Sequence, residues 1–327
     1  MGDESTLAIA VDLGGTQVRA ALVEAGRIVS RTALPTDVAG GPTAILHQIE
    51  TMVDHVSDGN DRSRIAGLGL SSAGPIDTTS GTVLGIPTLP GWENFPVSVQ
   101  LSQKIGLPVW VENDAIAATF GEWRHGAGRD LQNLVYLTVS TGIGGGAVVD
   151  GNLLHGRKGM ACHIGHIRLA RDGPICSCGA TGCFEAFASG SALAKRARET
   201  AQKADAQYLK RAVQDGEINA KDVFEGARSG DHQCLDLVEK HANCLGLGIT
   251  SLLHVFSPQL VIMGGGLAAG FDLLEPGMHR IIQREAMDPF KTVRIVRSRL
   301  DDNSGLLGAA ALVLDRARSG DSETGLY

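Results

Sequence analysis

The chain contains two copies of a unit in which a short strand, a glycine-rich turn and a second strand follow one another. The copies cover Leu7–Val23 and Leu134–Val149. In each copy, apolar residues typical of a buried strand lead into a turn with adjacent glycines, and strand character then resumes. An internal repeat with a spacing of about 130 residues predicts two similar lobes that face each other across a cleft.

The two turns have the composition of phosphate-binding loops. Their sequences are Asp12-Leu13-Gly14-Gly15-Thr16 and Ser140-Thr141-Gly142-Ile143-Gly144-Gly145-Gly146. Glycine lets backbone N–H groups approach phosphate oxygens, and the hydroxyls of Thr16 and Thr141 can donate further hydrogen bonds. Asp12 ends a strand, where it could orient Mg²⁺ through water. Either turn alone could be a simple tight hairpin, but a third glycine run after a strand, Gly264–Gly266, favours nucleotide binding.

Two other nucleotide-binding motifs are excluded. The P-loop pattern G-x-x-x-x-G-K-[ST] does not occur in the sequence. The stretch Gly142–Ala147 matches G-x-G-x-x-[GA], but a Rossmann loop must open a helix. Here the following residues alternate and turn back at Asp150-Gly151, which predicts a hairpin.

Composition limits the partners of the chain. Its 327 residues are enough for two domains, and 43 of them are glycine, about 13% against an average of roughly 7%. The net charge of −7, without a basic tract, argues against nucleic acid or an anionic membrane as a partner. No apolar run approaches the roughly 18 residues of a membrane span, and no signal peptide is recognised. The predicted compartment is therefore the cytoplasm.

The remaining pattern alternates strands and helices, which predicts an α/β fold. A helix opens at Pro42, a polar helical stretch over about 201–231 carries little pattern, and the tail over 319–327 is expected to be disordered. Further strands are predicted at Ile65–Leu70, Val109–Val111 and Leu260–Met263, and further helices over about 190–203, 233–256 and 305–318.

Three cysteines and one histidine have the spacing of a zinc site. His166, Cys176, Cys178 and Cys183 form the pattern H-x₉-C-x-C-x₄-C, and Cys₃His is a tetrahedral zinc-binding set. Because the protein fills all four positions, the predicted site is structural and would help to fold the segment 163–185. Unliganded thiols are the alternative.

Asn113-Asp114 follows a buried strand and precedes a helix, and it supplies the best candidate for a catalytic base. Asp114 could accept a proton from a substrate hydroxyl, as transfer of a phosphoryl group to an alcohol requires. The alternative is a simple helix cap, since Asn and Asp both cap well. Glu185 could bind a sugar hydroxyl or lie favourably at a helix N-terminus. His163 by itself is more typical of a packed polar residue.

Taken together, these motifs resemble the ROK family (repressor, open reading frame, kinase), over about Leu7–Leu314. The resemblance rests on Asp12–Thr16, Asn113-Asp114, Ser140–Gly146, Gly165-His166 with Cys176–Gly179, and Gly182–Ala186. It implies an actin-like ATPase (ribonuclease H-like) fold with two lobes, and a homodimer. The lobes would be 1–116, completed by the helix over about 305–318, and 117–304 with the zinc-binding segment.

The resemblance also implies a set of site residues for an ATP-dependent sugar kinase with Mg²⁺ and a structural zinc ion. Asp114 would be the general base. The sugar contacts would be Gly74, Thr88, Asn113, Asp114, His163, His166 and Glu185. The nucleotide contacts would be Asp12, Gly14, Gly15, Thr16, Gln17, Thr141, Gly142, Gly144, Gly145, Gly265 and Gly266. His166 would then both bind zinc and face the sugar.

One departure from the family pattern bears on the substrate. Most sugar kinases of the family carry Glu-x-Gly-His before the cysteines, whereas this chain has His163-Ile164-Gly165-His166. That sequence is similar to the branch that phosphorylates N-acetylmannosamine, which implies transfer to its 6-hydroxyl. Another hexose, such as N-acetylglucosamine or glucose, is the alternative. A sugar-responsive repressor is less favoured, because the acidic chain shows no helix-turn-helix before its first strand.

Overall fold

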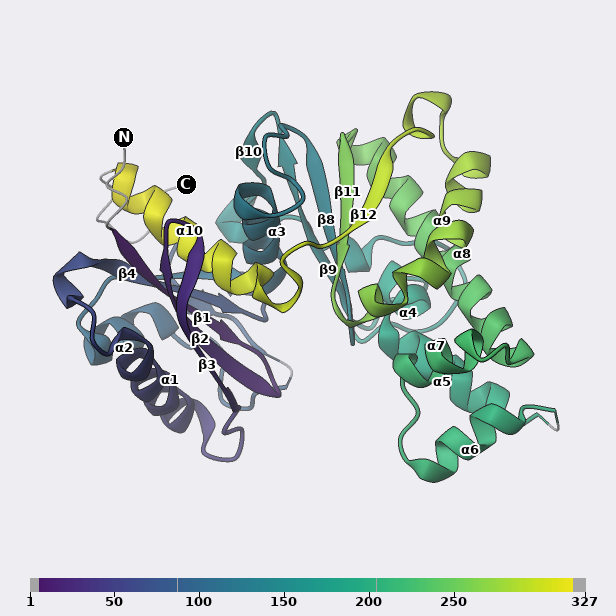
Figure 1. Cartoon of the computed structure of the whole chain (residues 1–327), viewed down its shortest axis with the longest axis horizontal. Helices are drawn as coiled ribbons and strands as arrows, with labels where there is room; N and C mark the ends of the chain where they lie inside the picture. The colour runs from purple at the N-terminus through teal and green to yellow at the C-terminus, as the bar shows by residue number, and fades with distance from the viewer. Residues whose placement is uncertain (1–5, 87, 204, 320–327) are drawn as a thin grey trace. The chain divides into compact units, whose positions relative to one another are not determined.

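The computed structural model describes residues 6–86, 88–203 and 205–319. The chain divides into two compact units. Unit 1 comprises Met1–Asp130, Leu153–Cys162 and Arg299–Tyr327, and unit 2 comprises Leu131–Asn152 and His163–Ser298. Each unit is built around one five-stranded sheet (Figure 1).

The two sheets have the same strand order, which confirms the internal repeat. In unit 1 the order is β3-β2-β1-β4-β7, and in unit 2 it is β10-β9-β8-β11-β12. In each sheet the strand before the glycine turn pairs antiparallel with the strand after it and parallel with a later strand. The unit 1 strands are β1 (Leu7–Leu13), β2 (Gln17–Glu24), β3 (Arg27–Pro35), β4 (Ile65–Ser72) and β7 (Val109–Asn113). The unit 2 strands are β8 (Leu134–Val139), β9 (Ile143–Val149), β10 (Asn152–Leu153), β11 (Leu260–Gly264) and β12 (Arg294–Arg297).

Helices cover both faces of the unit 1 sheet (Figure 1). On one face, α1 (Gly41–Ser57) and α2 (Val97–Ile105) enclose a core that includes Ile49 and Leu70. On the other face, α10 (Ser304–Ser319) packs on β1 and β4 and encloses a smaller core with Ala10 and Leu306. A short hairpin of β5 (Ile76–Asp77) and β6 (Thr82–Val83) lies outside this sheet.

Close packing between α10 and α3 (Asp114–His125) fixes the start of both helices in unit 1. A Cβ atom at Gly308 of α10 would collide with the carbonyl of Ala117, and one at Gly121 of α3 would collide with the carbonyl of Ser304. Because these glycines lack a side chain, the two helix backbones can approach this closely. The N-terminus of α3 follows β7 directly, and the Cβ position of Gly305, at the start of α10, lies 3.3 Å from Oδ1 of Asp12 near the end of β1.

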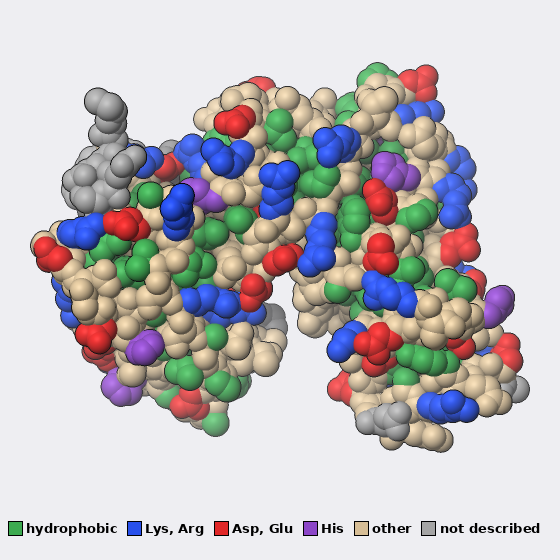
Figure 2. Space-filling view, viewed as in Figure 1, with side chains coloured by type: hydrophobic (Ala, Val, Ile, Leu, Met, Phe, Trp, Pro, Cys, Tyr) green, Lys and Arg blue, Asp and Glu red, His purple; other side chains and the backbone are tan. Residues whose placement is uncertain are grey.

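In unit 2, α8 (His232–Phe256) and α9 (Phe271–Glu285) pack against each other, and α8 also contacts β8. Four shorter helices complete the unit, namely α4 (Phe184–Ala188), α5 (Gly190–Ala201), α6 (Gln207–Asp215) and α7 (Ala220–Arg228). The described residues also form six short 3₁₀ helices, which are Arg62–Arg64, Arg157–Gly159, Ile164–His166, Gly266–Gly270, Asp288–Phe290 and Asp301–Asn303. Figure 2 shows acidic and basic side chains interspersed on the visible face of each unit. No helix among the described residues is both long and apolar enough to cross a membrane.

Three sequence-based expectations differ from the structure. Gly144–Gly146 belong to strand β9 rather than to a loop, because they pair with Tyr136–Thr138 of β8. The boundary expected at residue 116 falls within α3, which belongs to unit 1 because it packs on α10. Ser319 of the expected tail ends α10, and the remainder of that tail lies outside the described residues.

Candidate active site

Asp12 lies in a row of polar side chains across the unit 1 sheet. It pairs with Arg19 on β2 and with Ser71 on β4, and Ser71 pairs with Glu112 on β7. The Ser71 hydroxyl donates to Asp12 Oδ1 at 2.8 Å, and Arg19 donates to Oδ2 at 3.3 Å. Burial raises the pKa of the Asp12 carboxyl, against the opposing effects of Ser71 and Arg19. A carboxylate with these partners is suited to orient a hydrated Mg²⁺ ion.

The first turn exposes two successive backbone N–H groups. Within it, Gly14 N–H donates to the Gln17 carbonyl at 3.0 Å, and the Thr36 hydroxyl donates to the Gly14 carbonyl at 2.7 Å. The N–H groups of Gly15 and Thr16 donate no hydrogen bond within the described part of the chain. Unpaired successive N–H groups beside glycine form an anion-binding concavity.

The second turn, in unit 2, has the same property. Ser140 N–H donates to the Gly142 carbonyl at 2.9 Å, and Gly190 N–H donates to the Ser140 carbonyl at 2.7 Å. The N–H groups of Thr141 and Gly142 have no partner among residues 6–86, 88–203 and 205–319. Within the described part of the chain, each of the two turns therefore offers a pair of unpaired N–H donors.

The predicted nucleotide residues that follow β11 lie beside the second turn. Gly265 has φ +82°, and a Cβ atom there would lie 2.5 Å from the Val139 carbonyl oxygen. Gly266 is more open, with the Ser140 hydroxyl oxygen 3.7 Å from its Cβ position. Gly145, in contrast, faces the protein interior, because a Cβ atom there would collide with Ile164. The lack of a side chain at Gly145 therefore serves packing within the protein. Gly144, beside it, is also part of β9.

Asp114 occupies the first turn of α3, and Asn113 is the cap residue of that helix. The Asn113 side chain accepts from the N–H groups of Ala115 and Ile116, at 3.1 and 3.4 Å. Asp114 Oδ1 also accepts from Ala115 N–H, at 2.8 Å, and the side chain remains open to solvent. Protein packed around this carboxyl and the negative charge of Asp12 raise its pKa to about 6. A carboxylate of this basicity is suited to general-base catalysis near neutral pH.

A buried carboxylate that the sequence analysis missed supports Asn113. Glu112 is 5% exposed, and its Oε1 accepts from Asn113 N–H at 2.9 Å. Its Oε2 lies 3.2 Å from Nε2 of His155, in the segment Leu153–Cys162 that returns to unit 1. That segment is also tied to unit 1 by Lys158, whose ammonium donates to Asp77 at 2.7 Å. Only the tertiary fold brings His155 to Glu112, whereas the hairpin register of β1 and β2 could have identified Arg19 as the partner of Asp12.

Two predicted sugar contacts of unit 1 lie next to other predicted site residues. The Cβ position of Gly74 is 3.6 Å from Nδ2 of Asn113. Thr88 is exposed, and its side chain fills the space that a Cβ atom on Gly15 would need. The structure thus brings Gly15, Thr88, Gly74, Asn113 and Asp114 to one region of unit 1, and places His163, His166 and Glu185 in unit 2.

His166, Cys176, Cys178 and Cys183 converge in unit 2. Their ligand atoms all lie within 4.8 Å of one another. Nδ1 of His166 is 3.6 Å from Sγ of Cys176, and the sulfurs of Cys178 and Cys183 are 3.8 Å apart. Three sulfurs and one imidazole nitrogen at this separation fit a tetrahedral zinc ion, which the four side chains would hold without an open position.

Glu185 lies between this cluster and the second glycine turn. Its Oε2 accepts from Ile143 N–H at 2.9 Å, and its Oε1 accepts from the Ser177 hydroxyl at 3.1 Å. It is in the first turn of α4, as expected for an acidic residue near a helix N-terminus. Ser177, which the sequence analysis did not single out, is exposed between two of the cysteines.

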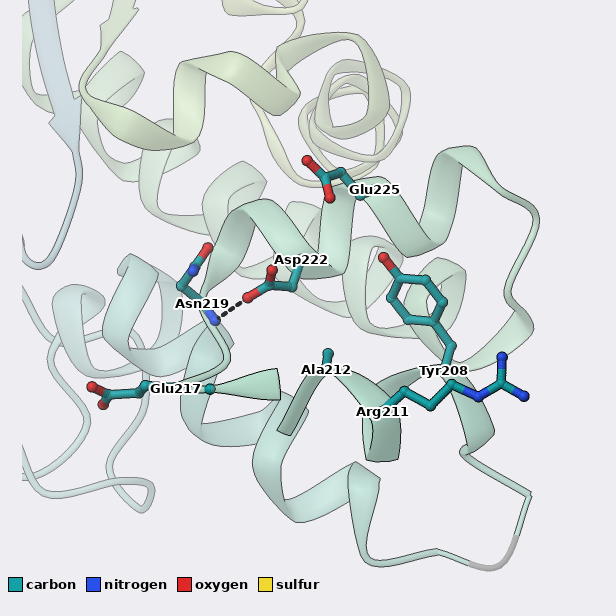
Figure 3. Close-up of a pocket in the computed structure, with 8 residues that line it drawn as sticks. Tyr208, Arg211, Ala212, Glu217, Asn219, Asp222 and Glu225 are labelled. Atoms are coloured by element: carbon teal, nitrogen blue, oxygen red, sulfur yellow. Dashed lines mark hydrogen bonds between the residues drawn. The ribbon is translucent and has the colours of Figure 1, made fainter. Parts of the chain in front are cut away.

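A pocket lies within the stretch 201–231, whose sequence carries little pattern, and some of its polar residues cap a helix. Figure 3 shows it between α6 and α7, with Tyr208, Arg211 and Glu217 among the residues that line it. Its carboxylate Asp222 accepts from Asn219 N–H at 2.7 Å as part of a capping box that begins α7. Asn219 and Asp222 thus stabilise a helix end, while Glu217 lies within ion-pair distance of Arg198.

The fold and these residues define a class of α/β protein with two similar five-stranded sheets, a glycine turn after the first strand of each pair, and an aspartate of raised pKa at the start of a helix. Comparison with known proteins gives the family. The ROK family profile matches residues 8–316. The glucokinase of Thermotoga maritima is 36% identical over 311 residues, which are 94% of this chain and 97% of that protein. The N-acetylmannosamine kinase of Salmonella newport is 34% identical over 307 residues, which are 93% and 97% of the two chains.

A solved structure agrees with the sequence comparison. The ROK family glucokinase of Streptomyces griseus, in complex with glucose and AMPPNP, has a TM-score of 0.81 and 34% identity to this chain. The match covers 94% of this chain and 98% of that one. The chain belongs to the ROK family, and its similarity to sugar kinases of that family extends over almost its whole length.

Proposed function

We propose that the protein is an ATP-dependent sugar kinase that transfers the γ-phosphate of ATP to the 6-hydroxyl of a hexose or N-acetylhexosamine. The observation that carries the proposal is the repeated turn with two N–H groups that have no partner among the described residues, once at Gly15-Thr16 and once at Thr141-Gly142. Such turns suit the β- and γ-phosphates, and the likeness to two named sugar kinases supplies the acceptor class.

In the proposed mechanism, the carboxylate of Asp114 accepts the proton of the sugar hydroxyl as the oxygen attacks the γ-phosphorus in line, while the bond from that phosphorus to the bridging oxygen breaks and ADP leaves. Its pKa of about 6 leaves it mostly ionised at neutral pH. Asp12, held by Ser71 and Arg19, would orient a Mg²⁺ ion that neutralises charge on the phosphates. Positioning and charge stabilisation account for most of the rate in such transfers.

The site residues of the proposal are those that the family resemblance implied, except for Gly145, where Ile164 fills the space of a Cβ atom. We propose that Gln17 and Gly265-Gly266 contribute to nucleotide binding, and that Gly74, Thr88, Asn113, His163, His166 and Glu185 contribute to sugar binding. Zinc held by His166 and the three cysteines would order the segment that carries these histidines.

For the acceptor we propose N-acetylmannosamine. His163 takes the position of the glutamate in the Glu-x-Gly-His pattern of most family kinases, and it is exposed beside His166, with the ring centroids 6.3 Å apart. A neutral or cationic ring cannot accept two sugar hydroxyl hydrogens as a carboxylate does. Glucose is the second candidate, because a glucokinase is among the relatives at 36% identity.

The test is ADP release with N-acetylmannosamine, N-acetylglucosamine, glucose and mannose at matched concentrations, for the wild type and His163→Glu. We expect the wild type to have its highest kcat/KM on N-acetylmannosamine, and the variant to gain on glucose relative to it. A wild-type preference for glucose would contradict the acceptor assignment. Absence of phosphorylated product with every sugar would contradict the kinase itself.

A further inference from the structure

Glu185 makes contacts that a sugar-binding carboxylate would not need. Both of its oxygens are already engaged within unit 2, Oε2 by Ile143 N–H at 2.9 Å and Oε1 by the Ser177 hydroxyl at 3.1 Å. Sγ of Cys176 lies 3.7 Å from the same Oε1. The carboxylate therefore connects the backbone beside the second glycine turn to the segment that contains the cysteine and histidine cluster.

The hydrogen bond between Glu185 and Ile143 lies beside the second glycine turn, where it can set the geometry of that turn. Ile143 directly follows Thr141 and Gly142, whose N–H groups are unpaired within the described residues. A side chain on Gly142 would place its Cβ 2.5 Å from Oε2 of Glu185, so the carboxylate lies against the turn itself. By engaging the third N–H, Glu185 limits how the two free donors can rotate.

Two backbone hydrogen bonds from residues that follow α4 in the chain also contact this turn. Gly190 N–H donates to the Ser140 carbonyl at 2.7 Å, and Ser191 N–H donates to the Thr141 carbonyl at 3.4 Å. These bonds come from the start of α5, which follows α4 directly. The segment from Ser177 to Ser191 thus contacts the turn through one carboxylate and two backbone donors.

We infer that Glu185 is a positioning residue through which the metal-binding segment sets the Thr141-Gly142 turn, so that metal occupancy controls ATP affinity. The inference rests on the proposed function, in which this turn binds phosphate. It differs from the family-implied role of Glu185 as a sugar contact, because it predicts an effect on nucleotide binding in the absence of sugar.

The negative charge of Glu185 and its hydrogen bond to Ile143 are expected to have opposite effects on ATP affinity, so substitutions can separate them. A carboxylate near a phosphate site repels it, so removal of the charge alone would tighten ATP binding. Loss of the hydrogen bond to Ile143 would loosen the turn and weaken binding. Glu185→Gln keeps an oxygen acceptor without the charge, whereas Glu185→Ala removes both.

The experiment measures the Kd of AMPPNP with Mg²⁺ by calorimetry, without sugar, for zinc-loaded and chelator-treated protein. For Glu185→Ala we expect about tenfold weaker binding, the effect of losing one hydrogen bond to a charged group, and for Glu185→Gln a change within about threefold. Ser177→Ala should weaken binding to an intermediate extent. Glu239→Ala, an exposed carboxylate on α8, is the matched control and should bind as the wild type does.

Metal removal completes the test. We expect chelation to weaken AMPPNP binding in the wild type and to add no further loss in Glu185→Ala, with circular dichroism used to confirm that each sample remains folded. Wild-type or tighter affinity in Glu185→Ala, or a chelation effect that is equal in both proteins, would overturn the inference. A wild type that binds no AMPPNP would instead count against the proposed function.

Discussion

Activity is expected to fall below pH 6, because Asp114 must be ionised to accept the sugar proton. Its pKa is raised to about 6 by the surrounding protein and by the charge of Asp12. At pH 5 only about one tenth of such a carboxyl is ionised, whereas an ordinary aspartate with a pKa of about 3.9 would be about nine tenths ionised. The structure thus predicts that kcat/KM for the sugar at pH 5 is about tenfold below its plateau.

The assay is quantification of phosphorylated sugar between pH 4.5 and 8 at saturating ATP and Mg²⁺. Removing the negative charge of Asp12 in Asp12→Asn should lower the pKa of Asp114, so the acid limb of the residual activity should move to lower pH. This shift separates the ionisation of Asp114 from that of ATP, which is common to both proteins. A plateau that extends to pH 4.5 in the wild type, or an acid limb that Asp12→Asn leaves in place, would refute the reasoning.

Asp114→Asn tests the role of Asp114 as the general base directly, because it keeps the shape of the side chain and removes its basicity. We expect kcat to fall by about 10²–10⁴-fold, with the Kd values of AMPPNP and sugar within about threefold of the wild type. Since the protein packed around Asp114 and the charge of Asp12 disfavour the ionised carboxyl in the folded state, the variant should be at least as stable as the wild type above pH 6. Turnover close to that of the wild type would exclude Asp114 as the base.

Three further predictions follow from packing and ligation. Gly308→Ala should lower the free energy of unfolding by about 1–3 kcal/mol, because its Cβ meets the Ala117 carbonyl, and an unchanged urea midpoint would contradict this. His155→Ala removes the imidazole nitrogen that lies 3.2 Å from the buried carboxylate of Glu112, and should lower the free energy of unfolding by about 1–3 kcal/mol, with His155→Gln closer to the wild type in the same urea titration. Metal analysis of purified protein should find about one equivalent of zinc per chain and less in Cys178→Ser, whereas a folded, active and metal-free protein would exclude the zinc site.

Local physical chemistry made several features predictable. The hairpin after β9 follows from Asp150-Gly151, which have φ values of 50° and 73°, because a two-residue turn of this type needs positive φ at both positions. The convergence of the four candidate zinc ligands follows from their short spacing. The two glycine turns and the strands around them were also expected, since each depends on residues close together in the chain.

Long-range pairing decided what the sequence could not. Ser71 reaches Asp12 only because β4 is placed beside β1 in the sheet, and His155 reaches Glu112 only because the segment Leu153–Cys162 returns to unit 1. Gly145 looked like part of a phosphate loop, yet it is a strand residue that pairs with Leu137 of β8, and Ile164 and Tyr136 fill the space that a side chain there would need. A glycine that binds a ligand and a glycine that packs against the chain have the same sequence signal.

The sequence by itself determined the repeated strand–turn–strand unit, the short spacing of the candidate zinc ligands and the position of Asp114 after a strand, because each depends on neighbours along the chain. The tertiary structure alone decided which N–H groups of the turns stay unpaired, which charges lie beside Asp114, and that Glu185 contacts Ile143. These outcomes depend on strand order and helix packing, which bring together residues that are far apart in sequence.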